Sequence, residues 1–246
     1  MAARVTNPTQ LADLAGRGLV TRAGSATAAQ ARTLPLLPVF APLVPQCAVQ
    51  RGSVVGCVGA AAVTLALAVA AGPSQQGAWV AVAGMPSLGL AAAAEAGVVL
   101  ERLVAVTEPV DADGAVQPFD DEVWGDLLAA CIDGFDVVLL GPGTQQVRPA
   151  TARRLVARLQ ARGAMAVTVG APVFGADLRF ECAAATWVGL GDGHGVAQAR
   201  RAQLALTGRR VPQERRLDCW LPAVDGQLRA CEPTVDGIVT PLRRTG

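Results

Sequence analysis

The stretch from Arg51 to Gly72, RGSVVGCVGAAAVTLALAVAAG, has the layout of a nucleotide-binding P-loop: a short apolar strand, a glycine-containing turn and a helix. A working loop follows the pattern G-x-x-x-x-G-K-[ST]. Its backbone N–H groups hold phosphates, its lysine reaches the β- and γ-phosphates, and its hydroxyl group binds magnesium. The chemistry to look for is therefore phosphate binding and ATP hydrolysis.

The residues that carry this chemistry are replaced. With Gly56 as the first glycine, the second glycine, the lysine and the hydroxyl residue fall on Ala61, Ala62 and Val63, and Thr64 comes one residue too late. The methyl group of an alanine crowds the backbone where a phosphate would pass. We expect a P-loop in layout only, with no nucleotide or other cofactor bound there.

The rest of an ATPase site is also missing. No lysine occurs anywhere in the chain, and arginine binds phosphate with a different geometry. The later strand that would end in a magnesium-binding carboxylate, DVVLLGP, ends in Gly141 and Pro142. Asp133 and Asp136 precede that strand and fall at its other end. The sequence therefore predicts a protein without ATPase activity.

Other catalytic and metal chemistry finds little support. Four serines and no G-x-S-x-G motif argue against a hydrolase triad. His194, in GLGDGHG, is the only histidine, and none of the six cysteines has C-x-x-C spacing, so we expect no metal site. Cysteines inside apolar runs indicate reduced, structural thiols and a cytoplasmic protein, with association with the nucleoid left open.

Two membrane signals are weak. The N-terminus carries Asp13 and no apolar segment typical of a signal peptide. Val54 to Ala71 is apolar and near spanning length, but Gly56 and Gly59 interrupt it and few of its side chains are large. We therefore interpret it as a buried strand and a buried helix that ends at Gly72-Pro73-Ser74.

The net charge of +1 hides an asymmetry. Residues 1–147 hold 6 arginines and 12 acidic residues, whereas residues 148–246 hold 15 arginines and 8 acidic residues. In the segment 150–162, arginines recur every fourth residue beside an apolar side, which is typical of an exposed helix face. Both features allow a contact with nucleic acid or an acidic partner, and both also fit an ordinary solvated surface.

The central part of the chain alternates between apolar strands and helices. Strands are predicted at 53–58, 78–84, 102–107, 136–141 and 164–169, and helices at 60–71, 88–97, 120–132 and 150–162. Short continuous apolar strands that alternate with helices predict an α/β fold, with a mostly parallel sheet covered by helices on both faces. Beyond residue 175, strand-like segments joined by turns at 191–195 and 224–227 predict an antiparallel C-terminal extension.

We expect three parts along the chain. Residues 1–46 form an N-terminal arm that has a short helix near Gln10–Leu14 and a proline-rich linker at 34–46, LPLLPVFAPLVPQ. Residues 47–222 form the core domain, and residues 223–246 form a C-terminal tail. The proline-rich segment is extended and apolar, so it should pack on the domain or on a partner.

The order of these blocks resembles the core of RecA. The segments RGSVVGCVGAAAVTLALAVA, AWVAVAGMP and FDVVLLGP are similar to its Walker A strand and helix, its catalytic-glutamate strand and its Walker B strand. The resemblance places the glutamate position near Met85 and the Walker B aspartate on Gly141. Features such as LPLLPVFAPLVP and WVGLGDGHG make the chain most similar to the actinobacterial ImuA-prime and ImuA group, across roughly residues 34–222.

The resemblance implies a non-catalytic adaptor in DNA-damage-induced mutagenesis, within the SOS response and translesion synthesis. Its expected partner is an ImuB-like relative of the Y-family polymerases, with RecA or an error-prone polymerase as further partners. The alternatives are a SulA-like inhibitor of cell division that binds FtsZ and a protein that binds single-stranded DNA through arginines. The oligomeric state stays open. Nine arginines are candidate contacts for DNA or a partner: Arg154, Arg158, Arg162, Arg200, Arg201, Arg209, Arg210, Arg215 and Arg216.

Overall fold

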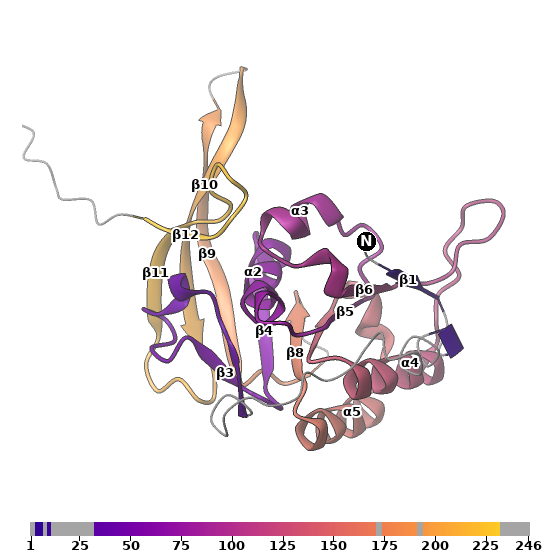
Figure 1. The fold of residues 1–246 in the computed structure, drawn as a ribbon. Coiled ribbons are helices and arrows are strands. Elements are labelled where there is room, and N and C mark those ends of the chain that lie inside the picture. The colour runs from indigo at the N-terminus through magenta and orange to yellow at the C-terminus, as the bar shows by residue number, and fades with distance from the viewer. Residues whose placement is uncertain (1–2, 7–8, 11–31, 171–173, 191–193, 232–246) are drawn as a thin grey trace, which may run out of the picture.

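A computed structural model describes residues 3–6, 9–10, 32–170, 174–190 and 194–231. Within these residues, a ten-stranded sheet runs through the molecule in the order β1-β6-β5-β7-β8-β4-β9-β10-β11-β12, and β2 and β3 form a small separate sheet (Figure 1). Pairing is parallel from β1 to β9 and antiparallel from β9 to β12. The fold is therefore mixed α/β, with a mostly parallel sheet and antiparallel C-terminal strands.

The strands follow the apolar runs of the sequence. Their bounds are β1 Ala3–Val5, β2 Thr33–Pro35, β3 Ala48–Gln50, β4 Val54–Gly59, β5 Val80–Ala83, β6 Leu103–Val106, β7 Val137–Leu140, β8 Met165–Val169, β9 Leu178–Leu190, β10 Gly195–Thr207, β11 Arg215–Trp220 and β12 Arg229–Ala230. The five central strands lie within one residue of the predicted ranges or inside them. Each is buried along nearly its whole length, as strands covered on both faces must be.

The helices connect the parallel strands. They are α2 Ala62–Gln75, α3 Leu90–Glu95, α4 Asp121–Gly134 and α5 Pro149–Arg162, with 3-10 turns η2 Pro38–Phe40, η3 Leu100–Arg102 and η4 Pro142–Gln146. Capping residues explain where α4 begins and where α5 ends. Asp120 caps α4 by accepting a hydrogen bond from the Val123 N–H, and Gly163 ends α5 in the left-handed conformation.

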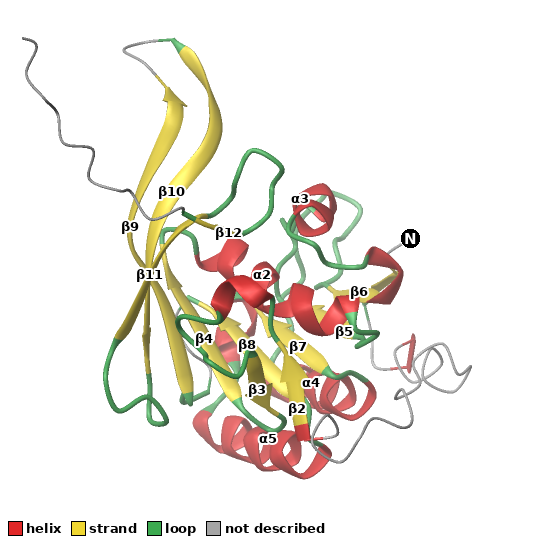
Figure 2. Ribbon diagram, turned by 60° about the vertical axis from the view of Figure 1, so that its left-hand side comes forward, coloured by secondary structure: helices red, strands yellow, loops and turns green. Residues whose placement is uncertain are grey.

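The strand order divides the helices between the two faces. Through α2 and α3 the chain moves from β4 to β5 and β6, whereas through α4 and α5 it moves back to β7 and β8. Because parallel crossovers are right-handed, connections in opposite directions lie on opposite faces. Two hydrophobic clusters agree with this: one contains α2, and the other contains the buried sides of α4 and α5 (Figure 2).

The proline-rich segment belongs to the α2 face. Leu34, Leu36, Phe40 and Leu43 are at most 5% exposed and lie in the same cluster as α2. A Cβ at Gly72 of α2 would stand 2.7 Å from the carbonyl carbon of Leu36, so the absent side chain lets this segment cross the helix closely. Of the two sequence alternatives for residues 34–46, packing on the domain is confirmed.

Helix α2 is longer than predicted. Pro73 does not end it; the helix continues to Gln75. Gly72, Pro73 and Ser74 are all buried, and the Ser74 hydroxyl accepts a hydrogen bond from the Val99 N–H at 2.9 Å. Tertiary packing therefore holds a last turn that the sequence alone disfavours.

The β9–β10 hairpin extends beyond the body of the protein as an arm (Figures 1 and 2). Strand β9 pairs with β4 only from Leu178 to Cys182, although it continues to Leu190. The predicted antiparallel extension is confirmed for β9, β10 and β11, but its first strand is parallel to β4. Of the two predicted turns, residues 191–193 of the first lie outside the described residues, as does most of the predicted helix near Gln10.

Candidate functional site

The turn between β4 and α2 lies at the carboxyl end of the parallel strands, where open α/β sheets bind their ligands. Gly59 has φ +88°, and a Cβ there would stand 2.6 Å from the carbonyl oxygen of Cys182. Helix α2 starts after Ala61, which offers no capping side chain, and its first turn holds no acidic residue. The free N–H groups of this helix start therefore have no charged or hydroxyl partner in the turn itself.

The residues of the degenerate phosphate pattern are divided between β4, the turn and the start of α2. Gly56 lies inside β4, paired with Thr168 and Arg179, rather than in the turn. Ala61 is 2% exposed, Ala62 is half-buried, and Val63 is exposed. The stretch thus presents methyl groups where a P-loop presents a lysine and a hydroxyl.

Thr64 is engaged elsewhere. Its hydroxyl oxygen accepts a hydrogen bond from Nη2 of Arg200 on β10 at 3.4 Å. Arg200 also donates from Nε to the carbonyl oxygen of Leu221 at 2.6 Å, and its guanidinium lies 5.2 Å from the ring centre of Trp187. Arg200 therefore ties the arm to the start of α2.

Met85 and Gly141 meet at the ends of two neighbouring strands, β5 and β7. A Cβ placed on Gly141 would stand 2.0 Å from Cγ of Met85 and 2.5 Å from the carbonyl oxygen of Gly84. Met85 is 7% exposed and belongs to the α2-side cluster. The thioether side chain thus fills the space that any side chain at position 141 would need.

Backbone contacts also close the space between the carboxyl ends of β5 and β7. Gly84 has φ +67°, and a Cβ there would stand 2.8 Å from the Thr144 nitrogen. The Gly143 N–H donates to the Gly84 carbonyl oxygen at 3.0 Å, and the Thr144 hydroxyl donates to the Gly141 carbonyl oxygen at 2.7 Å. The ends of β5 and β7 are therefore closed by direct backbone contact.

Carboxylates lie instead at the opposite, amino-terminal end of the strands. Asp136 is 5% exposed; it accepts from Nη1 of Arg51 at 2.8 Å and from the Trp79 N–H at 3.2 Å. Asp177 accepts from the Val54 N–H at 2.9 Å. These acids hold strands and connections together, and the placement of Asp136 before its strand is confirmed.

The nine candidate arginines do not form one patch. Arg154, Arg158 and Arg162 are exposed on α5, where Arg158 and Arg162 both bind Asp133 of α4. The Arg158 hydrogen bond is the main cause that holds the pKa of Asp133 below its usual value. A single carboxylate therefore holds two of the three candidate arginines of α5 in a contact between the helices.

The other six candidate arginines lie on β10, on β11 and in the turn between these two strands. Arg209 and Arg210 lie near Asp177, at 3.3 and 3.9 Å, close to the amino end of β4. Arg215 donates to the Leu43 carbonyl oxygen at 2.8 Å, and Arg216 binds Glu214 at 2.6 Å. Arg201 is exposed on β10, next to Arg200. Whether any of them contacts DNA or a partner stays a prediction.

The arm carries a surface that the sequence reasoning did not identify. Trp187, Val188, Leu190 and Val196 are 41%, 45%, 56% and 73% exposed. The available signal was the run CAAATWVGL at 182–190, which contains no charged residue and no proline. Such runs usually indicate a buried strand, so its exposure here stands out.

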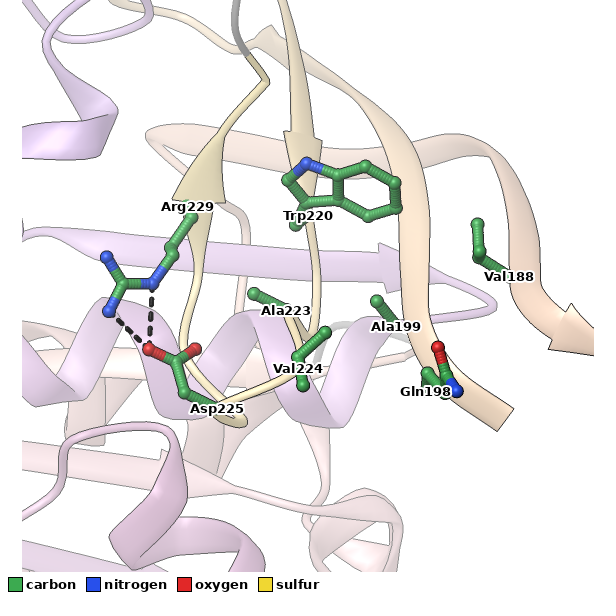
Figure 3. A pocket seen from close by; sticks show the side chains of 8 residues that line it. All are labelled: Val188, Gln198, Ala199, Trp220, Ala223, Val224, Asp225 and Arg229. Carbon is green, nitrogen blue, oxygen red and sulfur yellow. Dashed lines mark hydrogen bonds and ion pairs between the residues drawn. The ribbon is translucent and has the colours of Figure 1, made fainter. Parts of the chain in front are cut away.

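A cavity of about 470 Å³ opens on one face of this arm (Figure 3). Val188, Ala199 and Trp220 come from three adjacent strands, and Val224 extends from the turn that follows β11. An ion pair between Asp225 and Arg229 closes one side. The cavity is lined mainly by apolar groups and could receive an apolar side chain of a partner.

The six cysteines lie within the described residues and form no disulfide. Burial raises the pKa of the Cys57 thiol and raises those of Cys131 and Cys219 to about 12. Such thiols stay protonated at neutral pH and are poor nucleophiles. The same part of the chain contains no helix with the length and apolar content needed to cross a bilayer.

The fold defines a mixed α/β protein in which Met85 and glycine backbones close the carboxyl ends of β5 and β7. Residues 42–175, more than half of the chain, match the sequence model of the MT3502 N-terminal domain, and the chain belongs to that family. It is also 36% identical over 100 residues to Uncharacterized protein Rv3395c of Mycobacterium tuberculosis. The alignment covers 41% of this chain and 44% of the relative, so the chain spans less than half of that protein's length.

Proposed function

We propose that this chain is a non-catalytic RecA-like adaptor in DNA-damage-induced mutagenesis, which binds an ImuB-like relative of the Y-family polymerases. The single observation that carries its non-catalytic part is the contact between Met85 and Gly141. The resemblance puts the catalytic glutamate and the Walker B aspartate at these two positions. Position 85 carries a thioether, and while that side chain fills the space above Gly141, position 141 cannot hold a carboxylate.

The arrangement of the strands supports the RecA-like part of the proposal. Two positions that act on the same phosphate must lie near each other, and Met85 and Gly141 do so at the ends of adjacent strands. The loop-bearing strand β4 lies inside the sheet, and its turn opens at the same carboxyl edge. This proximity supports a RecA-like plan, and in the proposal the reactive groups of that plan are absent.

Binding of a protein fits the surface better than binding of DNA. The arginines are divided between α5, β10 and the amino end of β4, and several are held by Asp133, Asp177 or Glu214. Salt-dependent DNA binding needs a continuous set of phosphate contacts. The exposed apolar arm, in contrast, is the kind of surface that mediates protein contacts.

Isothermal titration with ATP and magnesium tests the loss of catalysis. We expect no heat of binding at protein concentrations near 100 μM and no release of phosphate. Micromolar binding accompanied by hydrolysis would show that the site is active and would refute the proposal. A Met85→Glu variant is a useful companion, because one restored acid without a lysine should not restore hydrolysis.

Co-purification tests the partner. Recovery of the ImuB-like protein supports the adaptor function, whereas recovery of FtsZ instead favours the SulA-like inhibitor. The proline-rich segment is unsuitable for a deletion test, because Phe40 and Leu43 are part of the core. A Val188→Lys variant on the arm, with Ala92→Lys on the exposed face of α3 as the matched control, probes the surface without removing core residues.

A further inference from the structure

The open edge of the arm is its most unusual feature. Past Cys182, β9 pairs only with β10, so one side of its backbone from Ala183 to Leu190 has no neighbouring strand among the described residues. All eight residues of this segment are exposed. Unpaired N–H and C=O groups along such an edge are ready to accept another strand.

The edge lacks two of the usual protections, although register shifts interrupt its ladder with β10 next to Cys182 and near Leu190. Exposed edge strands normally carry charged side chains or proline, which prevent pairing with another chain. The segment 183–190 has neither, and it contains Trp187, Val188 and Leu190. Its composition favours strand addition.

We propose that two copies of this chain pair through this edge, with their β9 strands antiparallel about a twofold axis at Trp187. This inference goes beyond the proposed function and does not depend on it. A second copy fits because the paired segments themselves carry no charged residue. An isologous twofold contact of this kind is the commonest way in which identical chains associate.

The register follows from two constraints. In an antiparallel pair, opposite residues share a face of the sheet, so the sum of their numbers is even in a symmetric pair. With the axis at Thr186, Leu190 would lie opposite Cys182, which β4 already occupies through Gly59. Of the axes that avoid this overlap, the one at Trp187 gives the longest paired segment, pairs Leu190 with Ala184 of the second copy, and puts the two Trp187 rings side by side.

This register also covers an exposed residue outside the arm. Cys182, at the base of the open edge, pairs with Gly59, and α2 begins three residues later at Ala62. Val63 in the first turn of α2 is 43% exposed. Leu190 near the end of one arm would therefore approach the start of α2 in the second copy, where apolar surface is available to receive it.

The size of the contact sets its strength. The seven paired residues, 184–190, span only about 23 Å, so each copy buries less than the roughly 800 Å² of a standard interface. We expect a reversible dimer with a Kd of about 10–100 μM. Sedimentation velocity of the full chain between about 5 and 300 μM should show a concentration-dependent shift from monomer to dimer.

Charge reversal at Thr186 tests the geometry. The two Thr186 side chains would lie diagonally across the axis, about 7–8 Å apart. Thr186→Lys alone and Thr186→Glu alone should each weaken dimerisation at least tenfold, and an equimolar mixture should recover it as a heterodimer. Circular dichroism checks that both variants keep the fold.

The matched control is Ala197→Lys, an exposed position on β10 of the same arm but away from the β9 edge. It should dimerise like the unmodified chain. A chain that stays monomeric at 300 μM overturns the proposal, as does a mixture of the two Thr186 variants that fails to recover association. Equal loss of dimer in Ala197→Lys would place the contact elsewhere on the arm and would also overturn it.

Discussion

The two ends of the parallel sheet differ in the groups that hold them. At the amino-terminal end, Asp136 and Asp177 are fastened to Arg51 and to backbone N–H groups. At the carboxyl end, Met85 packs over Gly141, and glycine backbones meet directly. The end where parallel sheets bind ligands is thus apolar, while charge is kept at the end that only supports the fold.

The contacts at the two ends of the sheet differ in kind, so they should respond differently to substitution. A buried ion pair contributes to the fold only while both partners remain, and the amino-terminal pairs are complete. A reactive site requires charged groups that are exposed to a ligand, and the residues that close the ends of β5 and β7 are glycines and a methionine. A substitution at the carboxyl end should therefore destabilise the fold by a steric clash. A substitution at the amino-terminal end should destabilise it by leaving a polar or charged group without its partner.

The largest effect is expected for Gly141→Asp. The new side chain would clash with Met85 and Gly84 and would bury an unpaired carboxylate, so the free energy of unfolding should fall by about 4–5 kcal/mol. Urea denaturation measures this. Gly89→Asp is the control at the same edge, because Gly89 is the exposed N-cap of α3 and an aspartate there should be neutral or stabilising. An equal loss of unfolding free energy in both variants would contradict the close packing of Met85 against Gly141.

Arg51→Met should come next. It leaves the carboxylate of Asp136 buried without its cation and should cost about 3 kcal/mol in urea denaturation. The double variant Arg51→Met/Asp136→Asn removes both charges and should be more stable than the single variant. If the double variant is the less stable of the two, the ion pair does not act as described.

Asp177→Ala should have a smaller effect. The Val54 N–H would lose its carboxylate acceptor, which costs about 1–2 kcal/mol. Hydrogen exchange should show faster exchange at Val54, while the arm keeps its protection. Asp113→Ala, in an exposed turn, is the control and should change stability by less than about 0.5 kcal/mol.

Arg158→Ala should have the smallest effect, about 0.5 kcal/mol at pH 7, because the ion pair with Asp133 is largely exposed. Since the folded pKa of Asp133 is lowered, its contribution is present above the unfolded value of about 3.9 and is lost as pH falls through the folded value. NMR titration should show the pKa of Asp133 rising toward its usual value in the variant. No change would mean that Arg158 is not its main partner.

Much of the fold could be predicted from the sequence, because buried parallel strands are continuous apolar runs. The five central strands and the four helices were located in this way. The short strands β2 and β3 were not predicted, since three residues beside several prolines carry no periodic signal. The last turn of α2 depends on contacts with Leu36 and Val99, which local propensity cannot reveal.

The candidate site was predicted in part. The sequence identified Met85 and Gly141 as replaced positions, but the contact between them depends on how side chains pack across β5 and β7. The arm was missed for a different reason. Its apolar run satisfies the same pattern as a buried strand, and only the limited length of β4 leaves it uncovered.

The place of β4 also bears on how the chain folds. Val54 pairs with Ala166, and Val55 with Leu178, so β4 waits for more than a hundred residues of synthesis before either neighbour exists. Closure of such long loops slows folding, and the apolar stretch from β4 through α2 stays unpaired meanwhile. Refolding should therefore be slow and sensitive to protein concentration, and a nascent chain should need protection from aggregation until β9 is complete.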